Sequence, residues 1–146
     1  FRLRAYTDRT TGEVHLTLSQ GEITASEETL VRVHESVSLM DFIDCANRRH
    51  SFSVDQAMRA IARRGHGVIV LLHRKGAGDG LLAALRNEEQ KPVVKWDPRL
   101  YGIGAQILRE LGVGKMRLLS SPRKMPSMAG FGLEVCGYLT VEEALA

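Results

Sequence analysis

The sequence has few of the residues that stabilise small domains through cross-links or bound metal. Only two cysteines, Cys45 and Cys136, occur among the 146 residues, and they lie far apart in the chain. A disulfide framework and a four-cysteine zinc site are therefore excluded. No segment approaches the roughly 18 consecutive apolar residues of a membrane-spanning helix, so we expect no membrane partner and a cytoplasmic location.

Aromatic residues are also scarce, at 5% of the chain, and the excess of positive charge is small. Lys and Arg number 20 against 17 Asp and Glu, which gives a net charge of +3. A basic cluster is present, made of Arg48, Arg49, Arg59, Arg63 and Arg64. Because no aromatic platform accompanies this cluster, we interpret it as a solvated face and expect no nucleic-acid partner.

The length and the hydrophobic content of 44% fit one globular domain over residues 1–146. Such a domain buries enough surface to fold without a metal or a disulfide. The chain begins at Phe1 rather than Met and opens directly into a predicted strand. We therefore expect it to be a piece of a longer protein.

Hydrophobic patterning predicts an α/β domain with a single mixed β-sheet flanked by helices. Strands are predicted at residues 1–7, 14–18, 30–34, 67–72, 115–119 and 133–138. Ser53 and Gln56 have capping-box spacing, which predicts a helix from Ser53 to a stop at Gly65. Further helices are predicted at 81–88, from the N-cap Asp97 to Gly112, and after Thr140. The order of the strands does not follow from the pattern.

Three segments have residues suited to binding an anion or moving a proton. The glycine-rich stretch 75–80 follows a buried strand, where backbone N–H groups can approach a phosphate, although a tight turn is the simpler interpretation. Ser120, Arg123 and Lys124 follow another strand, and a solvated basic loop explains them equally well. Asp97 and Arg99 start a helix, where an N-cap and a surface charge are the simpler interpretation.

A metal site has weak support from residue spacing alone. Cys45 and His50 are near each other in sequence, and His34 would complete three protein ligands for a catalytic zinc. Nothing in the spacing selects His34, so buried or surface residues without a ligand role remain the simpler interpretation.

Longer motifs resemble one enzyme family, GTP cyclohydrolase II, which opens riboflavin synthesis. The resemblance rests on Tyr101-Gly-Ile-Gly-Ala-Gln-Ile-Leu108, Leu111-Gly-Val113, Met116-Arg-Leu-Leu119, Pro122-Arg-Lys124 and Gly130-Phe-Gly-Leu-Glu-Val135. It continues backward through the glycines at 76, 78 and 80, the stretch Arg32-Val-His34, and Phe1-Arg2 with His15-Leu16. It thus covers nearly the whole chain.

The resemblance implies a catalytic site that has lost its metal ligands. The family binds zinc through three cysteines, and counting without gaps from Arg32 places Val37, Arg48 and His50 at those positions. Valine has no donor atom, and a protonated arginine repels a cation, so we expect no zinc cofactor. The acidic residue of the substrate loop is replaced by Lys75.

Other family positions are retained, and the resemblance implies roles for them. Asp97 and Arg99 match the pair assigned as proton acceptor and as nucleophile toward the nucleotide phosphate. Arg32, Ser120 and Lys124 fall near positions that contact GTP, and together with Lys75 they are candidates for binding a nucleotide or phosphate. The resemblance thus identifies Asp97 and Arg99 as remnants of a catalytic site, which does not make them active.

The resemblance therefore implies a degenerate GTP cyclohydrolase II-like domain without ring-opening activity. Such domains occur behind 3,4-dihydroxy-2-butanone 4-phosphate synthase in bifunctional riboflavin-biosynthesis proteins, so we expect a C-terminal module that supports or regulates a fused synthase, within a homodimer. One alternative is a residual site for GTP, pyrophosphate or another anion. Another is an active enzyme with a non-standard site, such as a metal held by His34, Cys45 and His50.

Overall fold

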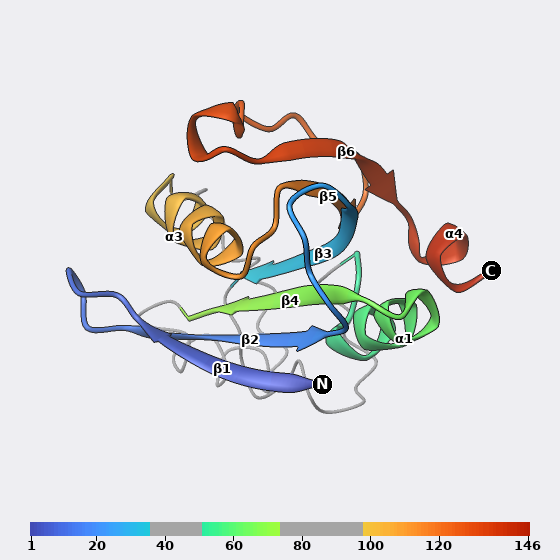
Figure 1. The fold of residues 1–146 in the computed structure, drawn as a ribbon, viewed down its shortest axis with the longest axis horizontal. Helices are drawn as coiled ribbons and strands as arrows, with labels where there is room; N and C mark the ends of the chain where they lie inside the picture. The colour runs from blue at the N-terminus through green and yellow to red at the C-terminus, as the bar shows by residue number, and fades with distance from the viewer. Residues whose placement is uncertain (36–50, 74–97) are drawn as a thin grey trace, which may run out of the picture.

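A computed structural model of the chain describes residues 1–35, 51–73 and 98–146 (Figure 1). In chain order, the elements are β1 (Arg2–Thr7), β2 (Val14–Gln20), β3 (Glu28–Glu35), α1 (Val54–Arg64), β4 (Gly67–Leu72), α3 (Pro98–Glu110), β5 (Lys115–Leu119), the 3-10 helix η2 (Ala129–Phe131), β6 (Glu134–Leu139) and α4 (Val141–Leu145). Within these ranges no helix is long and apolar enough to cross a bilayer.

The six strands form one mixed sheet in the order β1-β2-β4-β3-β5-β6 (Figure 1). β1 and β2 form an antiparallel hairpin, and β2 pairs antiparallel with β4. The strands β4, β3, β5 and β6 run parallel to one another. The carboxyl ends of these parallel strands therefore lie along one edge of the sheet, where ligand sites of open α/β sheets form.

The sheet has a hydrophobic core on each face, which explains the apolar run of β4. All six residues of this strand are buried, as expected for an interior parallel strand covered on both sides. Val68 and Val70 belong to the core that also contains Leu108 of α3. Ile69 alternates to the other face and belongs to the core that contains Ile61 of α1. The two helices therefore pack on opposite faces of the sheet.

Local sequence signals define the ends of α1 as predicted. The Ser53 hydroxyl accepts a hydrogen bond from the Gln56 N–H, and the Gln56 side chain accepts one from the Ser53 N–H, which confirms the capping box. Gly65 ends the helix with a φ of 92°, in the left-handed region that favours glycine. The strand begins immediately afterward at Gly67, where a Cβ would lie 2.6 Å from the Ile61 side chain. The short connection thus requires a glycine for close packing.

The structure confirms the α/β class and the mixed sheet, and it moves several boundaries. β2 continues to Gln20 because its last residues still pair with β4, and β3 begins at Glu28, which pairs with Lys115. β6 begins at Glu134 rather than at residue 133, because the Leu133 N–H bonds to the Met128 carbonyl. Thr140 caps α4 as predicted. The predicted helix 81–88 and the predicted N-cap Asp97 lie outside the described residues.

A bidentate ion pair joins β3 to β5 near the start of both strands. Arg117 donates to both carboxylate oxygens of Glu28, at 2.8 and 2.9 Å, and Arg64 of α1 lies 3.9 Å from the same carboxylate. The hydrogen bonds from Arg117 lower the pKa of Glu28 below its ordinary value, more than partial burial raises it. The ion pair therefore stabilises the fold when Glu28 is ionised.

Replacing Glu28 with glutamine is expected to lower the free energy of unfolding by about 1 kcal/mol at pH 7. Because the folded-state pKa of Glu28 is depressed, this contribution is present above about pH 4.3 and is lost as the pH falls further. Urea unfolding of the wild type and of Glu28→Gln between pH 7 and pH 3 measures this contribution. Glu27→Gln, which changes the exposed neighbouring residue, is the control. If the free energies of unfolding of the wild type and of Glu28→Gln differed by the same amount at pH 7 and at pH 3, this role would be contradicted.

Candidate functional site

The candidate site lies at the carboxyl edge of the parallel strands, around the loop that follows β5. Glu35, Leu72 and Leu119 end β3, β4 and β5 at this edge. The helix α3 ends near the opposite edge, since Leu111 shares a cavity with Ile23, which precedes β3. The first turn of α3, with Arg99, therefore points toward the carboxyl edge.

Two tyrosine hydroxyls fix the loop at residues 120–128. Tyr101, in the first turn of α3, donates to the Pro126 carbonyl at 3.0 Å, and Tyr138 of β6 donates to the Arg123 carbonyl at 3.0 Å. Burial, and secondly the nearby Tyr138, raises the pKa of Tyr101, so its hydroxyl remains protonated and able to donate. These bonds place the loop between α3 and β6.

Arg32 lies beneath this loop as a buried cation that binds the backbone. Its side chain is in the interior, with the residue only 4% exposed. The guanidinium donates to the Leu119 carbonyl at the end of β5 and to the Phe52 carbonyl just before α1, both at 3.0 Å. Arg32 therefore joins β3 to the start of the loop and to the segment that leads into α1. Two of its N–H donors are used in these bonds to the backbone.

Ser120 is also turned toward the protein. The residue is 7% exposed, and its hydroxyl donates to the Ser121 carbonyl at 3.1 Å. Its N–H bonds to the Leu139 carbonyl at the end of β6. In this arrangement Ser120 ends the pairing of β5 with β6, and its hydroxyl is engaged within the loop.

The cations of the candidate site lie at the surface. Arg99, Arg123 and Lys124 are exposed, on the first turn of α3 and on the loop that the tyrosines hold. The structure thus brings Arg32 and Ser120 together through the Leu119 carbonyl, and it places Arg99 and Lys124 on two segments that Tyr101 connects. At this edge, exposed positive charge lies on a backbone held by hydrogen bonds, which suits the binding of an anion.

Several predicted site residues lie outside the described residues. They are Val37, Cys45, Arg48, His50, Lys75 and Asp97, together with the glycine-rich stretch 75–80. The pairing of Asp97 with Arg99 and the replaced zinc ligands therefore stay predictions. Among the residues that the structure describes, no three His, Cys, Asp or Glu side chains form a group suited to a metal.

Sequence reasoning did not identify Tyr101 and Tyr138 as anchors of the loop. The chain has three tyrosines, and these two flank the predicted basic loop on either side. A scarce amphipathic residue beside a candidate loop, with an apolar ring and a polar tip, is a signal that could have identified them.

The sequence has clear relatives. The family model described as GTP cyclohydrolase II matches residues 1–140. A Neisseria meningitidis serogroup B protein named 3,4-dihydroxy-2-butanone 4-phosphate synthase is 46% identical over 143 residues, which cover 98% of this chain and 39% of that protein. The Chlorobium phaeovibrioides "Riboflavin biosynthesis protein RibBA" is 37% identical, with 97% of this chain and 38% of that protein covered. The chain thus spans about two fifths of the length of these relatives.

Solved structures also match this chain. One of them is the crystal structure of RibBX, described as a two domain 3,4-dihydroxy-2-butanone 4-phosphate synthase from A. baumannii. The sequence identity is 25% and the TM-score is 0.43, over 96% of this chain and 38% of that chain.

The variant Arg32→Lys is expected to lose about 1–3 kcal/mol of unfolding free energy, because a lysine cannot reach both buried carbonyls and leaves one acceptor unpaired. Urea unfolding measures the loss. Arg123→Lys, the same change at an exposed position of the loop, is expected to stay within about 0.5 kcal/mol of wild type. Equal effects of the two substitutions would contradict the structural role of Arg32.

Proposed function

The chain belongs to the GTP cyclohydrolase II family, and we propose that it is a degenerate member that lacks zinc and ring-opening activity. Its proposed role is that of a structural and regulatory module for a fused 3,4-dihydroxy-2-butanone 4-phosphate synthase in riboflavin biosynthesis. Relatives with that name support the fused partner, since this domain accounts for only 39% of their length. A cytoplasmic homodimer of the longer protein is part of the same proposal.

The cysteine content carries the proposal. The family's zinc site uses three cysteine ligands, whereas this chain contains two cysteines in all. One of them, Cys136 of β6, is exposed, and its thiol lies beside Glu28 at the start of β3. Because the candidate site surrounds the opposite ends of the strands, only Cys45 remains available as a thiolate ligand. The residues of this chain therefore do not fit the family's metal.

The matching positions have the wrong chemistry for metal binding. Counting from Arg32 places a valine, an arginine and a histidine, Val37, Arg48 and His50, where the three thiolates are required. One imidazole does not replace a set of three ligands. Opening of the guanine ring needs a water that is nucleophilic near neutral pH, which zinc supplies by lowering the pKa of its bound water. Surface cations such as Arg99 and Lys124 bind anions but do not remove protons.

The contacts of Arg32 support a retained structural role. In the family resemblance this residue lies near GTP, whereas here two guanidinium donors bind the Leu119 and Phe52 carbonyls. Those bonds hold β5 and the entry to α1 against β3. A domain that has lost its chemistry but keeps such contacts still presents an ordered surface to a fused partner.

Binding of a nucleotide or simpler anion without turnover is the second candidate function. It is favoured by one observation, that Tyr101 and Tyr138 fix the loop that carries the exposed Arg123 and Lys124. A fixed loop binds an anion at a smaller cost in conformational entropy than a free one does. GTP and pyrophosphate are the expected ligands, and Arg99 is the cation on the neighbouring helix.

The first test is GTP turnover by the purified chain with added zinc and magnesium, followed by product mass and by release of pyrophosphate. We expect no product and no stoichiometric zinc on the same sample, measured by elemental analysis. A family member that retains all three cysteines is the positive control. Ring-opened product with one zinc per chain would overturn the proposal, and loss of that product in Arg99→Ala would locate the active site.

The second test measures the effect of the domain on the fused synthase. Arg32→Lys weakens the domain, so in the fused protein we expect it to lower the temperature at which synthase activity is lost and to weaken dimerisation. Arg123→Lys is the matched control, for which we expect no change. Identical synthase activity, stability and oligomeric state with and without the domain would contradict a supporting role.

A further inference from the structure

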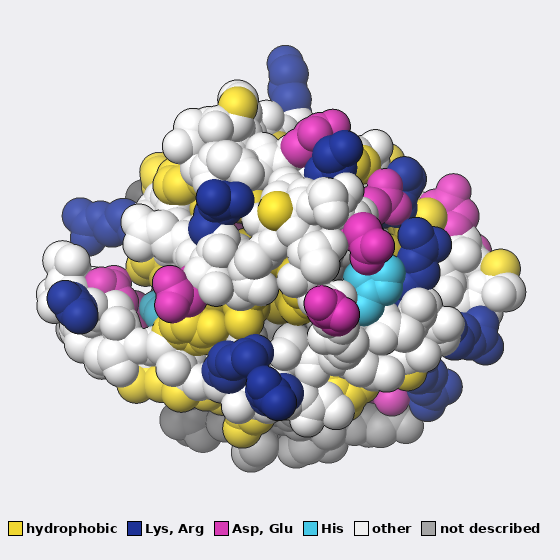
Figure 2. Space-filling view, in the orientation of Figure 1, with side chains coloured by type: hydrophobic (Ala, Val, Ile, Leu, Met, Phe, Trp, Pro, Cys, Tyr) yellow, Lys and Arg dark blue, Asp and Glu magenta, His cyan; other side chains and the backbone are white. Residues whose placement is uncertain are grey.

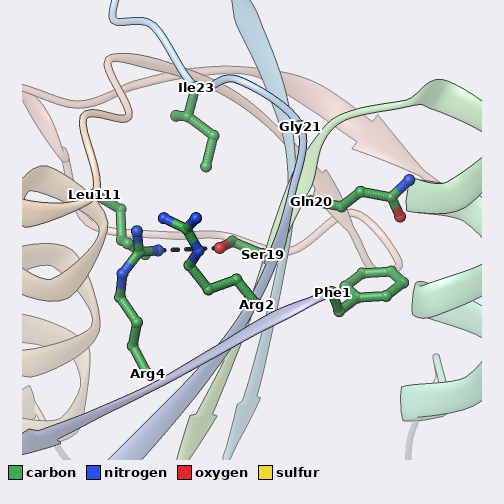
Figure 3. Close-up of a pocket in the computed structure, with 8 residues that line it drawn as sticks. All are labelled: Phe1, Arg2, Arg4, Ser19, Gln20, Gly21, Ile23 and Leu111. Carbon is green, nitrogen blue, oxygen red and sulfur yellow. Dashed lines mark hydrogen bonds between the residues drawn. The ribbon is translucent and has the colours of Figure 1, made fainter.

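A second basic site lies at the amino edge of the sheet, away from the loop that follows β5. It is a cavity of about 440 Å³ between the hairpin β1–β2, the turn after β2 and the end of α3 (Figure 3). Cavities of about 300–1,000 Å³ are typical for small ligands. Phe1, Arg2 and Leu111 of its lining belong to motifs that carry the family resemblance, but none of the site roles that the resemblance implies falls on this cavity.

Two arginines of β1, Arg2 and Arg4, supply the charge of this cavity. They are two residues apart on one strand, so their side chains leave the same face of the sheet. Figure 3 shows both guanidinium groups directed into the cavity near Ser19. Figure 2 shows basic side chains gathered over β1, next to a hydrophobic area.

Neither guanidinium has a carboxylate partner within the part of the chain that the structure describes. Arg4 donates to the Ser19 hydroxyl at 3.1 Å, and Arg2 forms no hydrogen bond or ion pair there. Glu22 follows Gly21 in the adjacent turn, but it does not line the cavity. Two positive charges that share a cavity repel each other, and a bound anion relieves this repulsion.

One wall of the cavity is tightly packed, and another is apolar. Gly21 has a φ of 73°, and a Cβ there would lie 2.3 Å from the Gly65 carbonyl, so the turn is held tightly against the end of α1. Ile23 and Leu111 form the apolar part of the lining. Such a wall accommodates the organic part of a ligand whose charged group faces the arginines.

A buried hydroxyl lies next to Arg4 on the neighbouring strand. Thr17 pairs with Arg4 in the β1–β2 ladder, so both side chains are on the face of the hairpin that carries the cavity. Thr17 is 0% exposed, and none of the described residues hydrogen-bonds its Oγ1. Buried hydroxyls without a partner are uncommon, and this one, which is unpaired within the described part of the chain, lies on the face that carries the cavity, although Thr17 is not among the lining residues.

We propose that this cavity binds the phosphate group of a small phosphomonoester. Two adjacent guanidinium groups match the charge of a phosphate dianion, and their forked N–H groups bind its oxygens in pairs. The apolar wall of Ile23 and Leu111 favours an ester over the free ion. The site is independent of the proposed loss of GTP chemistry, because it shares no residue with the edge that holds Arg99 and Lys124.

Calorimetric titration with inorganic phosphate and with phenyl phosphate tests the proposal. We expect both probes to bind the wild-type chain and phenyl phosphate to bind more tightly. Arg2→Gln and Arg4→Gln should each weaken binding about tenfold, the effect of losing one charge-assisted hydrogen bond. Arg9→Gln, which removes an exposed arginine of the β1–β2 turn, is the matched control and should leave affinity unchanged.

Further variants distinguish this cavity from the loop after β5. The variant Arg99→Gln/Lys124→Gln removes cations of the loop after β5 and of α3, and in this background Arg2→Gln and Arg4→Gln should still weaken the binding of both probes about tenfold. Loss of phosphate binding in that variant, with retention in Arg2→Gln, would overturn the assignment. Equal affinity for phosphate and phenyl phosphate would overturn the preference for an ester. If neither probe bound to a wild-type chain that is shown to be folded by its cooperative unfolding, the proposed phosphate site would be overturned.

Discussion

The hydrogen bonds of Arg32 connect the parts of the structure on which the candidate site depends. This one side chain of β3 binds the last carbonyl of β5 and the carbonyl of Phe52, just before α1. A guanidinium is suited to this role because its fixed donors reach two acceptors at once, and it stays charged at any physiological pH. Arg32 therefore fixes the end of β5 and the entry to α1 from the interior of the domain. The surface loop at residues 120–128 begins at this fixed end of β5.

Helix ends that are determined by residues close together in the sequence were predictable from the sequence. The capping boxes at Ser53 and Thr140 and the glycine stop at Gly65 each involve residues within a few positions, and the structure confirms them. The uninterrupted apolar run of β4 likewise indicated an interior strand. In these cases the local pattern and the packed structure agree, as expected for a sequence that folds to one state.

The contacts that build the site were not predictable in the same way. The bond from Arg32 to Leu119 spans 87 residues, and the bond from Tyr101 to Pro126 spans 25. Strand order depends on such long-range pairings, because a crossover can place β4 on either side of β3 without altering the pattern of either strand. The role of Arg32 was therefore assigned through a family resemblance, whereas its two backbone contacts emerge only when the strands are placed.

Loss of metal ligands is compatible with retention of this fold. Small domains that depend on zinc unfold without it, because ligand binding supplies most of their folding free energy. Here two hydrophobic cores cover the two faces of the sheet, one including Leu108 of α3 and the other Ile61 of α1. Since burial of such side chains supplies the main driving force for folding, substitutions at ligand positions alter the chemistry far more than the stability. A family member can then lose the thiolates at its ligand positions and still keep the same fold.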